Sequence, residues 1–337
     1  MQDLLPMPHD NSPSASASVI ICTYNRCESL GLTLESLCRL DTPRGFAWEL
    51  IVVDNNSNDA TKQVCERFAA KLPVRYFFEA RLGKSTALNR GIAESAGDLI
   101  LFTDDDVNVD KHWLLAIADG AKRHPAAVFF GGKVLPDWEA PPPKWVIENL
   151  DWLHINVHVD KGQTEAPIKD FLKSGDMPFF VGANMACRKE VFRSGLSFRE
   201  DIGPAGSDHS MSGNLRGEEI DLEERLLAMQ AVGIYLPSAV VYHRHPAHRQ
   251  TERYVRKYYF GGGVAEIRRS QQCPVGRYWF GAPRYLWKRL AVNSAKYVLT
   301  RPWAQSRTWL SAEKAMASTW GAITECRRLS SHDVAGN

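Results

Sequence analysis

Residues 99–106 read LILFTDDD, an apolar run that ends in three consecutive carboxylates. Three more short apolar runs, also rich in β-branched or aromatic residues, are found at Val19–Cys22, Leu50–Val53 and Val74–Phe78. Amphipathic segments of helical length separate the four runs, at Glu28–Arg39, Asp59–Lys71 and Lys84–Ala96. Such alternation is typical of a parallel sheet that helices cover on both faces. The sequence therefore predicts an α/β fold with a doubly wound, mainly parallel sheet.

Polar residues follow three of the four runs, at the point where each predicted strand ends. The first run is followed by Thr23, Tyr24, Asn25 and Arg26, the second by DNNS at residues 54–57, and the last by the acidic triplet. Ligands of a doubly wound sheet bind at the carboxyl ends of its strands. Turn and helix-cap chemistry is the alternative for residues 54–57 alone, but the three clusters together favour one site.

The triplet Asp104, Asp105 and Asp106 is costly to place at a buried strand end unless a cation neutralises it. Hard divalent cations such as Mn²⁺ and Mg²⁺ prefer oxygen ligands of this kind. Neighbouring side chains of a strand point in opposite directions, so the three carboxylates cannot all face one ion. An acidic surface turn is the alternative, and the buried run before the triplet argues against it.

The composition excludes several classes of protein. The chain has 337 residues, 44% of them hydrophobic, and its net charge of +2 argues against nucleic acid as the main partner. Seven cysteines without C-x-x-C spacing favour reduced thiols in a reducing, cytoplasmic setting. A P-loop would need glycine where Phe78 stands, and no G-x-G-x-x-G follows the first strand. No run reaches the ~18–20 apolar residues of a membrane span, so we expect a soluble or peripheral protein.

Three segments taken together resemble glycosyltransferase family 2. They are SVIICTYNR at 18–26, IVVDNNS at 51–57 and LILFTDDD at 99–106. The resemblance continues through GANM at 182–185, GEEID at 217–221 and YHRHP at 242–246, and so covers roughly residues 18–262. It implies a GT-A fold and inverting, metal-assisted transfer of a sugar from a nucleotide-diphosphate donor, with a UDP-sugar expected first.

The resemblance also assigns roles to individual residues. The donor-binding set that it implies is Thr23, Tyr24, Asn25, Arg26, Asp54, Lys84, Asn89 and Asp104. Asp104 is expected to face the ribose, while Asp105 or Asp106 binds Mn²⁺ or Mg²⁺. His243 would complete the metal site or contact the diphosphate, with His245 and His248 as alternatives. For Lys84, an ordinary solvent-exposed lysine remains the alternative.

The segment GEEID resembles the acidic acceptor-site motif of the family at the start of a helix. Inverting transfer needs a carboxylate that deprotonates the acceptor hydroxyl. Glu219 stands at the matching position, where aspartate is more usual, and Glu218 is a competitor for the same role. Acidic residues in a first helical turn are also favoured by the helix dipole alone; the upstream motifs favour catalysis by Glu219.

The resemblance and the chain pattern together predict three parts. Residues 1–17 lack a secretion-signal pattern and are expected to be a disordered lead-in. Residues 18–262 are expected to form the GT-A catalytic domain, with a nucleotide-binding half at 18–110 and an acceptor half at 130–250. Residues 263–330 are expected to form a helical C-terminal extension. We also expect a short strand at Ala239–Tyr242 and turns at 261–263, 281–283 and Pro302.

Aromatic and basic residues interleave from Arg277 to Arg301. Trp287, Ala291, Ala295 and Val298 are predicted to share a helical face. A helix of this composition suits the headgroup region of an anionic membrane. Packing against the catalytic domain is the alternative, and a lipid-linked acceptor would favour the membrane.

The sequence thus predicts an inverting glycosyltransferase of surface polysaccharide assembly, acting on a glycan or lipid-linked acceptor in the cytoplasm, at the inner face of the cell membrane. One alternative is a nucleotidyltransferase, whose usual Gly-rich basic loop after the first strand is missing here. Another is a non-catalytic glycan-binding protein on a decayed scaffold, against which the intact triplet and Glu219 argue.

Overall fold

The computed structural model describes residues 16–153, 158–172, 179–204, 217–270, 274–303 and 305–335. The predicted lead-in and Cys273 therefore lie outside the described residues, apart from Ser16 and Ala17, which begin the first strand. By its internal contacts the chain divides into two compact units. The first comprises Met1–Asp137, Val157–Glu200 and Glu218–Arg244, and the second comprises Trp138–Asn156, Asp201–Gly217 and His245–Asn337.

The first unit is built on a mixed sheet, nine-stranded in the described part of the chain, with the order β3-β2-β1-β4-β8-β6-β9-β5 and with β7 paired to β9. Its parallel half consists of β3 (Val74–Phe78), β2 (Ala47–Asp54), β1 (Ser16–Thr23) and β4 (Leu99–Asp104). The other strands are β5 (Val107–Val109), β6 (Ala127–Trp138), β7 (Ala166–Pro167), β8 (Met185–Arg188) and β9 (Val232–His245). The predicted doubly wound, mainly parallel sheet is confirmed.

Helices cover both faces of this sheet because alternate residues of each buried strand point to opposite sides. Val19 and Ile21 of β1 pack in one core with α1 (Cys27–Leu37) and α4 (Trp113–Arg123). Ile20, between them, packs in a second core with α3 (Lys84–Glu94) and α9 (Glu218–Ala228). The remaining helical elements of this unit are α2 (Thr61–Phe68), α7 (Ile168–Leu172), η1 (Gly182–Asn184) and α8 (Glu190–Arg193).

One strand is much longer than its sequence pattern indicates. The expected strand at Ala239–Tyr242 is the middle of β9, which runs from Val232 to His245. Gly233 and Pro237 interrupt the apolar pattern, so the sequence alone does not extend the strand. Pairing with other strands extends β9 beyond the apolar residues, since β7 pairs with its first part and β5 pairs with its last part.

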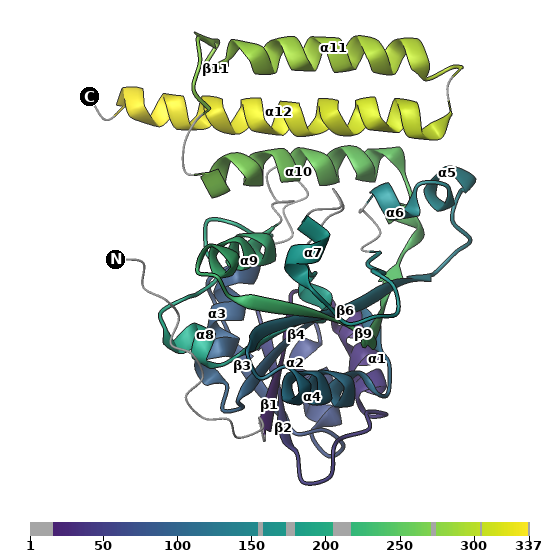
Figure 1. Cartoon of the computed structure of the whole chain (residues 1–337), viewed down its shortest axis with the longest axis vertical. Helices are drawn as coiled ribbons and strands as arrows, with labels where there is room; N and C mark the ends of the chain where they lie inside the picture. Colours follow the sequence, from purple (N-terminus) through teal and green to yellow (C-terminus); the bar gives the residue numbers. More distant parts are fainter. Residues whose placement is uncertain are drawn as a thin grey trace. The chain divides into compact units, whose positions relative to one another are not determined.

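The second unit is helical. It contains α5 (Lys144–Ile147), α6 (Leu150–Leu153), η3 (Ala247–Arg249), α10 (Glu252–Ser270), the hairpin β10 (Tyr278–Trp279) and β11 (Ala282–Pro283), α11 (Arg284–Thr300) and α12 (Ser306–Ala335). Helix α12 packs against α10 on one side and α11 on the other (Figure 1). Because α10 belongs to this helical layer, the unit begins before residue 263; the domain boundary at residue 262 stays a prediction. Among the described residues, no helix combines the length and the apolar character needed to cross a membrane.

The predicted turn at residues 261–263 is wrong, because α10 continues through all three glycines. These glycines serve close helix packing instead. A Cβ on Gly263 would lie 1.9 Å from the carbonyl oxygen of Ser318, and one on Gly321 would lie 2.1 Å from that of Phe260. Helices α10 and α12 therefore approach so closely that only hydrogen fits at these two positions.

The other two predicted turns are present, at the β10–β11 hairpin and around Pro302 between α11 and α12. The predicted face of α11 needs one correction. Trp287 does not share the outward side with Ala291, Ala295 and Val298, because its ring packs on Trp320 of α12 at a centroid distance of 6.2 Å. The neighbouring Leu286 is buried in the same cluster, which fixes the orientation of the helix.

We expect Gly263→Ala to destabilise the protein by roughly 1–3 kcal/mol, because the added methyl group collides with the backbone of α12. Gly262→Ala is the matched control, since nothing lies within 4 Å of a Cβ at Gly262. That change should stabilise the helix by up to about 1 kcal/mol. Urea unfolding followed by circular dichroism measures both effects, and equal effects of the two substitutions would contradict the close packing.

Candidate active site

Three strands of the first unit end at the same edge of the sheet. Because β1 pairs in parallel with β2 and β4, Thr23 lies beside Asp54 and Cys22 lies beside Asp104. The antiparallel pairing of β5 with β9 sets Val107 opposite His243, so that this histidine reaches the end of the acidic triplet. The strand-end residues therefore lie close together at one edge of the sheet, as predicted.

The carboxylate of Asp105 is bound by Thr23 and Arg26. It accepts hydrogen bonds from the Thr23 hydroxyl at 2.7 Å and from Nη1 of Arg26 at 2.9 Å. The same Arg26 nitrogen lies 3.2 Å from Asp106. Burial raises the pKa of Asp105, and the guanidinium of Arg26 opposes this rise. Arg26, predicted to bind the donor, thus already neutralises part of the triplet.

Asp104, Asp106 and His243 form a group that could hold a metal ion. Each offers one ligand atom, and these atoms lie within 4.8 Å of one another. Nε2 of His243 lies 3.3 Å from Asp106 and 4.0 Å from Asp104. Nδ1 of the imidazole faces the carbonyl oxygen of Arg244 at 3.1 Å, and a carbonyl only accepts, so Nδ1 carries a proton and Nε2 is the nitrogen that a neutral imidazole would offer to a metal.

This donor set fits Mn²⁺ or Mg²⁺, with two carboxylates and a neutral imidazole. It differs from the sequence expectation in one respect. Asp104 was expected to face the ribose, whereas the structure brings it together with Asp106 and leaves Asp105 outside the group. Asp104 is the last residue of β4, whereas Asp105 and Asp106 form the turn that leads into β5, so this turn and not strand alternation sets the direction of their side chains.

Lys84 joins the strand end to helix α9. Its ammonium group lies 2.9 Å from Asp104 and 3.3 Å from Glu218. Gly83 precedes Lys84 and has a φ of 143°, which glycine adopts easily; it allows the turn from which α3 begins. Burial acts to lower the pKa of Lys84, but the surrounding carboxylates raise it well above its usual value. Lys84 is therefore a partly buried cation paired with two carboxylates of the site, and not an ordinary solvent-exposed lysine.

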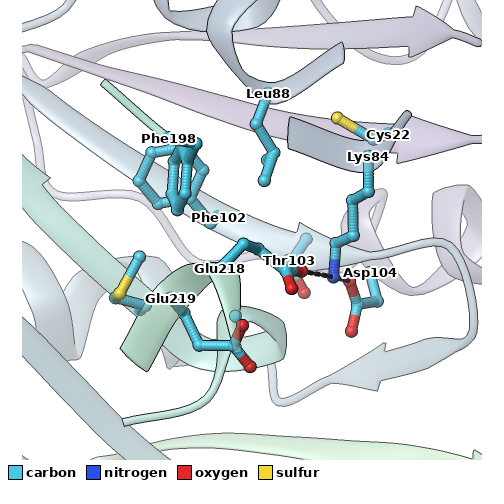
Figure 2. A pocket seen from close by; sticks show the side chains of 11 residues that line it. Cys22, Lys84, Leu88, Phe102, Thr103, Asp104, Phe198, Glu218 and Glu219 are labelled. Atoms are coloured by element: carbon cyan, nitrogen blue, oxygen red, sulfur yellow. Dashed lines mark hydrogen bonds and ion pairs between the residues drawn. The ribbon is translucent and has the colours of Figure 1, made fainter. Parts of the chain in front are cut away.

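A small pocket opens between β4, α3 and α9. It is lined by Cys22, Lys84, Leu88, Phe102, Thr103, Asp104, Gly182, Met185, Phe198, Glu218 and Glu219. Figure 2 shows Lys84, Asp104 and the two glutamates on one side and Leu88, Phe102 and Phe198 on the other. One wall is therefore charged and the other apolar, which suits a ligand with both polar and apolar surface.

The two candidate bases differ in their surroundings. Glu218 is held by its ion pair with Lys84 and is almost fully buried. Glu219 also lines the pocket, and its buried Oε2 has no hydrogen-bond partner among the described residues. Burial and the neighbouring Glu218 raise the pKa of Glu219 to about 8, against the opposing charge of Lys84. A carboxylate with this pKa accepts a proton readily near neutral pH.

Other predicted donor residues shape the loops of this edge. Asp54 accepts hydrogen bonds from the backbone of Ser57 at 2.8 Å and the hydroxyl of Tyr76 at 2.7 Å. Asn25, which has a φ of 51°, accepts one from the backbone of Asn58 at 2.8 Å. Tyr24, between Thr23 and Asn25, is half-buried at the same strand end.

Asn89 does not line the pocket. Its side-chain amide donates to the carbonyl of Phe198 at 2.8 Å and accepts from the backbone amide of the same residue at 2.9 Å. It thus fixes a segment that lies more than one hundred residues away in the chain. The ring of Phe198, which this clamp holds against the pocket, was missed by sequence reasoning because residues 194–204 show no periodic pattern. Cys22 and Thr103 were also missed, although each directly precedes a predicted site residue.

Comparison with known proteins gives a family match. The model of "Glycosyl transferase family 2" matches residues 18–196, just over half of the chain. The chain is 27% identical over 195 residues to the glucosyl-dolichyl phosphate glucuronosyltransferase of Haloferax volcanii, covering 57% of this chain and 58% of that protein. It is 28% identical over 268 residues to the pre-mycofactocin glycosyltransferase of Mycobacterium tuberculosis, covering 78% and 49% respectively. The alignments thus span about half the length of these curated relatives.

Solved structures agree on the fold. The mannosyltransferase PcManGT from Pyrobaculum calidifontis, solved with GDP-Man and Mn²⁺, superposes with a TM-score of 0.57 at 17% identity, covering 96% of this chain and 90% of its own. TarS 1-349 of S. aureus, solved with UDP-GlcNAc, gives a TM-score of 0.51 at 15% identity, with coverages of 93% and 92%. Both likenesses support the GT-A fold.

We expect Asp106→Asn and His243→Ala to abolish the Mn²⁺-dependent rise in the thermal midpoint, because each removes a ligand. In the unaltered protein, Mn²⁺ at about 100 times its Kd should add about 2.7 kcal/mol to the free energy of unfolding. Asp105→Asn is the matched control, since Asp105 faces Arg26 and should leave the metal effect in place. Loss of the effect in Asp105→Asn alone would contradict this assignment.

Proposed function

The chain belongs to glycosyltransferase family 2, and on that premise we propose that it moves a sugar from a nucleotide-diphosphate donor to an acceptor hydroxyl with inversion. One observation carries the proposal. The group Asp104, Asp106 and His243 lies at the strand end, and the carboxylate of Glu219 lines the pocket that Asp104 also lines. A donor diphosphate and an acceptor hydroxyl need these two kinds of group on opposite sides of one reacting carbon.

The donor half of the site holds the leaving group. Asp104, Asp106 and His243 would bind Mn²⁺ or Mg²⁺, which as a Lewis acid stabilises the negative charge that develops on the departing diphosphate. Arg26 and Lys84 keep their positive charge beside these carboxylates and add to the same potential. Thr23, Tyr24, Asn25 and Asp54 are proposed to line the nucleotide, and Asn89 to support the wall formed by Phe198.

The acceptor half carries out the proton transfer. The acceptor oxygen forms a bond to the anomeric carbon as the bond from that carbon to the β-phosphate oxygen breaks, and the electron pair leaves with the nucleoside diphosphate. The hydroxyl proton passes to Glu219, whose raised pKa and uncommitted Oε2 suit a general base. Glu218 is proposed to hold Lys84 in place, because it already forms an ion pair with it.

We propose UDP as the nucleotide and a glycan or lipid-linked hydroxyl as the acceptor. A structural neighbour solved with UDP-GlcNAc supports a uridine donor, and another solved with GDP-Man makes GDP the competitor. The relative from Haloferax volcanii, named for a glucosyl-dolichyl phosphate, supports a lipid-linked acceptor. Surface polysaccharide assembly in the cytoplasm, at the inner face of the cell membrane, is the setting that this acceptor implies. Six described cysteines are free thiols, as a reducing compartment requires.

A thermal-shift panel of UDP, GDP, UDP-sugars and GDP-mannose with and without Mn²⁺ tests the donor assignment. Ligands that bind only the folded state raise the midpoint. We expect the uridine ligands to give the largest rise, and only with Mn²⁺. No rise with any nucleotide at millimolar concentration would overturn the proposed function, whereas a larger rise with the guanosine ligands would overturn the choice of UDP alone.

Transfer should depend on pH through Glu219. Because the base must be deprotonated, kcat/KM should rise with pH and level off above about 8, where the pKa of Glu219 lies. Glu219→Gln should lower kcat by about 10²–10⁴-fold. Glu218→Gln should stay active, and its kcat/KM should rise at a lower pH than in the unaltered protein, because Glu218 raises the pKa of Glu219.

Glu224→Gln provides the matched control, since this exposed residue lies on the same helix. Its pH profile should match that of the unaltered protein. If Glu218→Gln abolished transfer while Glu219→Gln kept it, the base would be Glu218.

A further inference from the structure

The C-terminal part of the second unit differs in charge from the rest of the chain. Between Ile267 and Ala312 the sequence has nine Lys and Arg residues and no Asp or Glu, although the whole chain carries a net charge of only +2. The β10–β11 hairpin and helix α11 occupy the middle of this segment. Such a concentration of one sign favours an anionic partner.

Helix α11 has one packed face and one exposed apolar stripe. Leu286, Trp287 and Leu290 pack in one cluster with α12. Three residues spaced seven apart, and so two helical turns apart, form the stripe on another side. They are Tyr285, Val292 and Leu299, with side chains 48%, 57% and 73% exposed, and Trp303 follows just beyond the helix at 89%. We call these four residues the α11 stripe.

Basic side chains flank the α11 stripe along its length. Lys288 and Arg289 are exposed between Tyr285 and Val292, and Lys296 is exposed between Val292 and Leu299. Each lies three or four residues from a member of the stripe, and so next to it on the helix surface. Long basic side chains can lay their methylene groups along an apolar surface while their charges reach outward.

A bulky residue at the hairpin tip adds another exposed ring. Phe280 and Gly281 form the two-residue turn between β10 and β11, with φ values of 46° and 76°. Such turns favour Asn or Gly at the first position, because side chains rarely adopt a positive φ. Phe280 nevertheless stands there with 83% of its surface exposed. Its ring makes an edge-on contact with Trp287 at a centroid distance of 6.2 Å, but most of its surface stays open to an apolar partner.

We propose that the α11 stripe and Phe280 dock on the surface of an anionic lipid bilayer, with α11 lying in the plane of the headgroups. Exposed aromatic and aliphatic side chains flanked by Lys and Arg are the composition that this interface selects. A second copy of the chain is a poor occupant of the same surface. A twofold dimer through this face would place like charges opposite each other, which is repulsive.

Docking is a property of the second unit and does not depend on the identity of the donor or the acceptor. Docking would place the proposed reaction at the membrane surface, where a lipid-linked acceptor carries its hydroxyl. About 25 Å of helix α11 would lie along the bilayer, given 17 residues at 1.5 Å per residue.

Sedimentation with vesicles tests the proposal on the full chain. We expect binding to phosphatidylcholine vesicles that contain phosphatidylglycerol, no binding to phosphatidylcholine alone, and weaker binding as salt rises. The variant Lys288→Glu with Lys296→Glu should lower the partition coefficient at least about tenfold. Lys62→Glu with Lys122→Glu, on exposed positions of the first unit, makes the same change in net charge and should leave binding nearly unaltered.

The variant Phe280→Asn tests whether weaker vesicle binding could result from misfolding. Asparagine tolerates a positive φ, so this change should keep or raise the thermal midpoint while it weakens vesicle binding. The nucleotide-induced thermal shift should persist in every variant, which separates docking from the proposed transfer. Failure of the unaltered protein to bind anionic vesicles at low salt would overturn the proposal, as would unchanged binding by the Lys288 and Lys296 variant.

Discussion

Repulsion among carboxylates at the carboxyl edge of the sheet is the constraint on which the rest of the site depends. The triplet and the two glutamates of α9 approach one another where water is largely excluded. Two cations divide the neutralisation between them. Arg26 contacts Asp105 and Asp106, and Lys84 contacts Asp104 and Glu218. What remains between Asp104, Asp106 and His243 has the geometry of a cation site.

The same electrostatics sets apart the two glutamates of GEEID. Glu218 is paired with Lys84, whereas Glu219, whose Oε2 is buried, has no such ion pair among the described residues, and its pKa rises to about 8. Two carboxyl groups of identical chemistry therefore acquire different properties from their positions on one helical turn. The difference is what allows one of them to hold a lysine while the other accepts a proton.

The second unit depends on steric rather than electrostatic fit. Helices α10 and α12 meet where Gly263 and Gly321 leave no room for a side chain. That approach, with the packing of α11 on the far side of α12, fixes which face of α11 is exposed. In the sequence, the glycines at 261–263 indicate a turn, because glycine serves in turns and in close helix packing alike, and only the partner helix distinguishes the two uses.

The parallel half of the sheet and the polar clusters at its strand ends, the acidic triplet included, can be predicted from the amino-acid sequence, because periodic burial and strand-end polarity are local patterns. The sequence also singled out Lys84, Glu218, Glu219 and His243, although not their contacts. Tertiary structure alone decided that Asp104 and not Asp105 joins Asp106, that β9 extends over fourteen residues, and that Phe198 lines the pocket. The physical reason is that side-chain direction at a turn, strand pairing and long-range clamps such as Asn89 with Phe198 depend on partners distant in the chain.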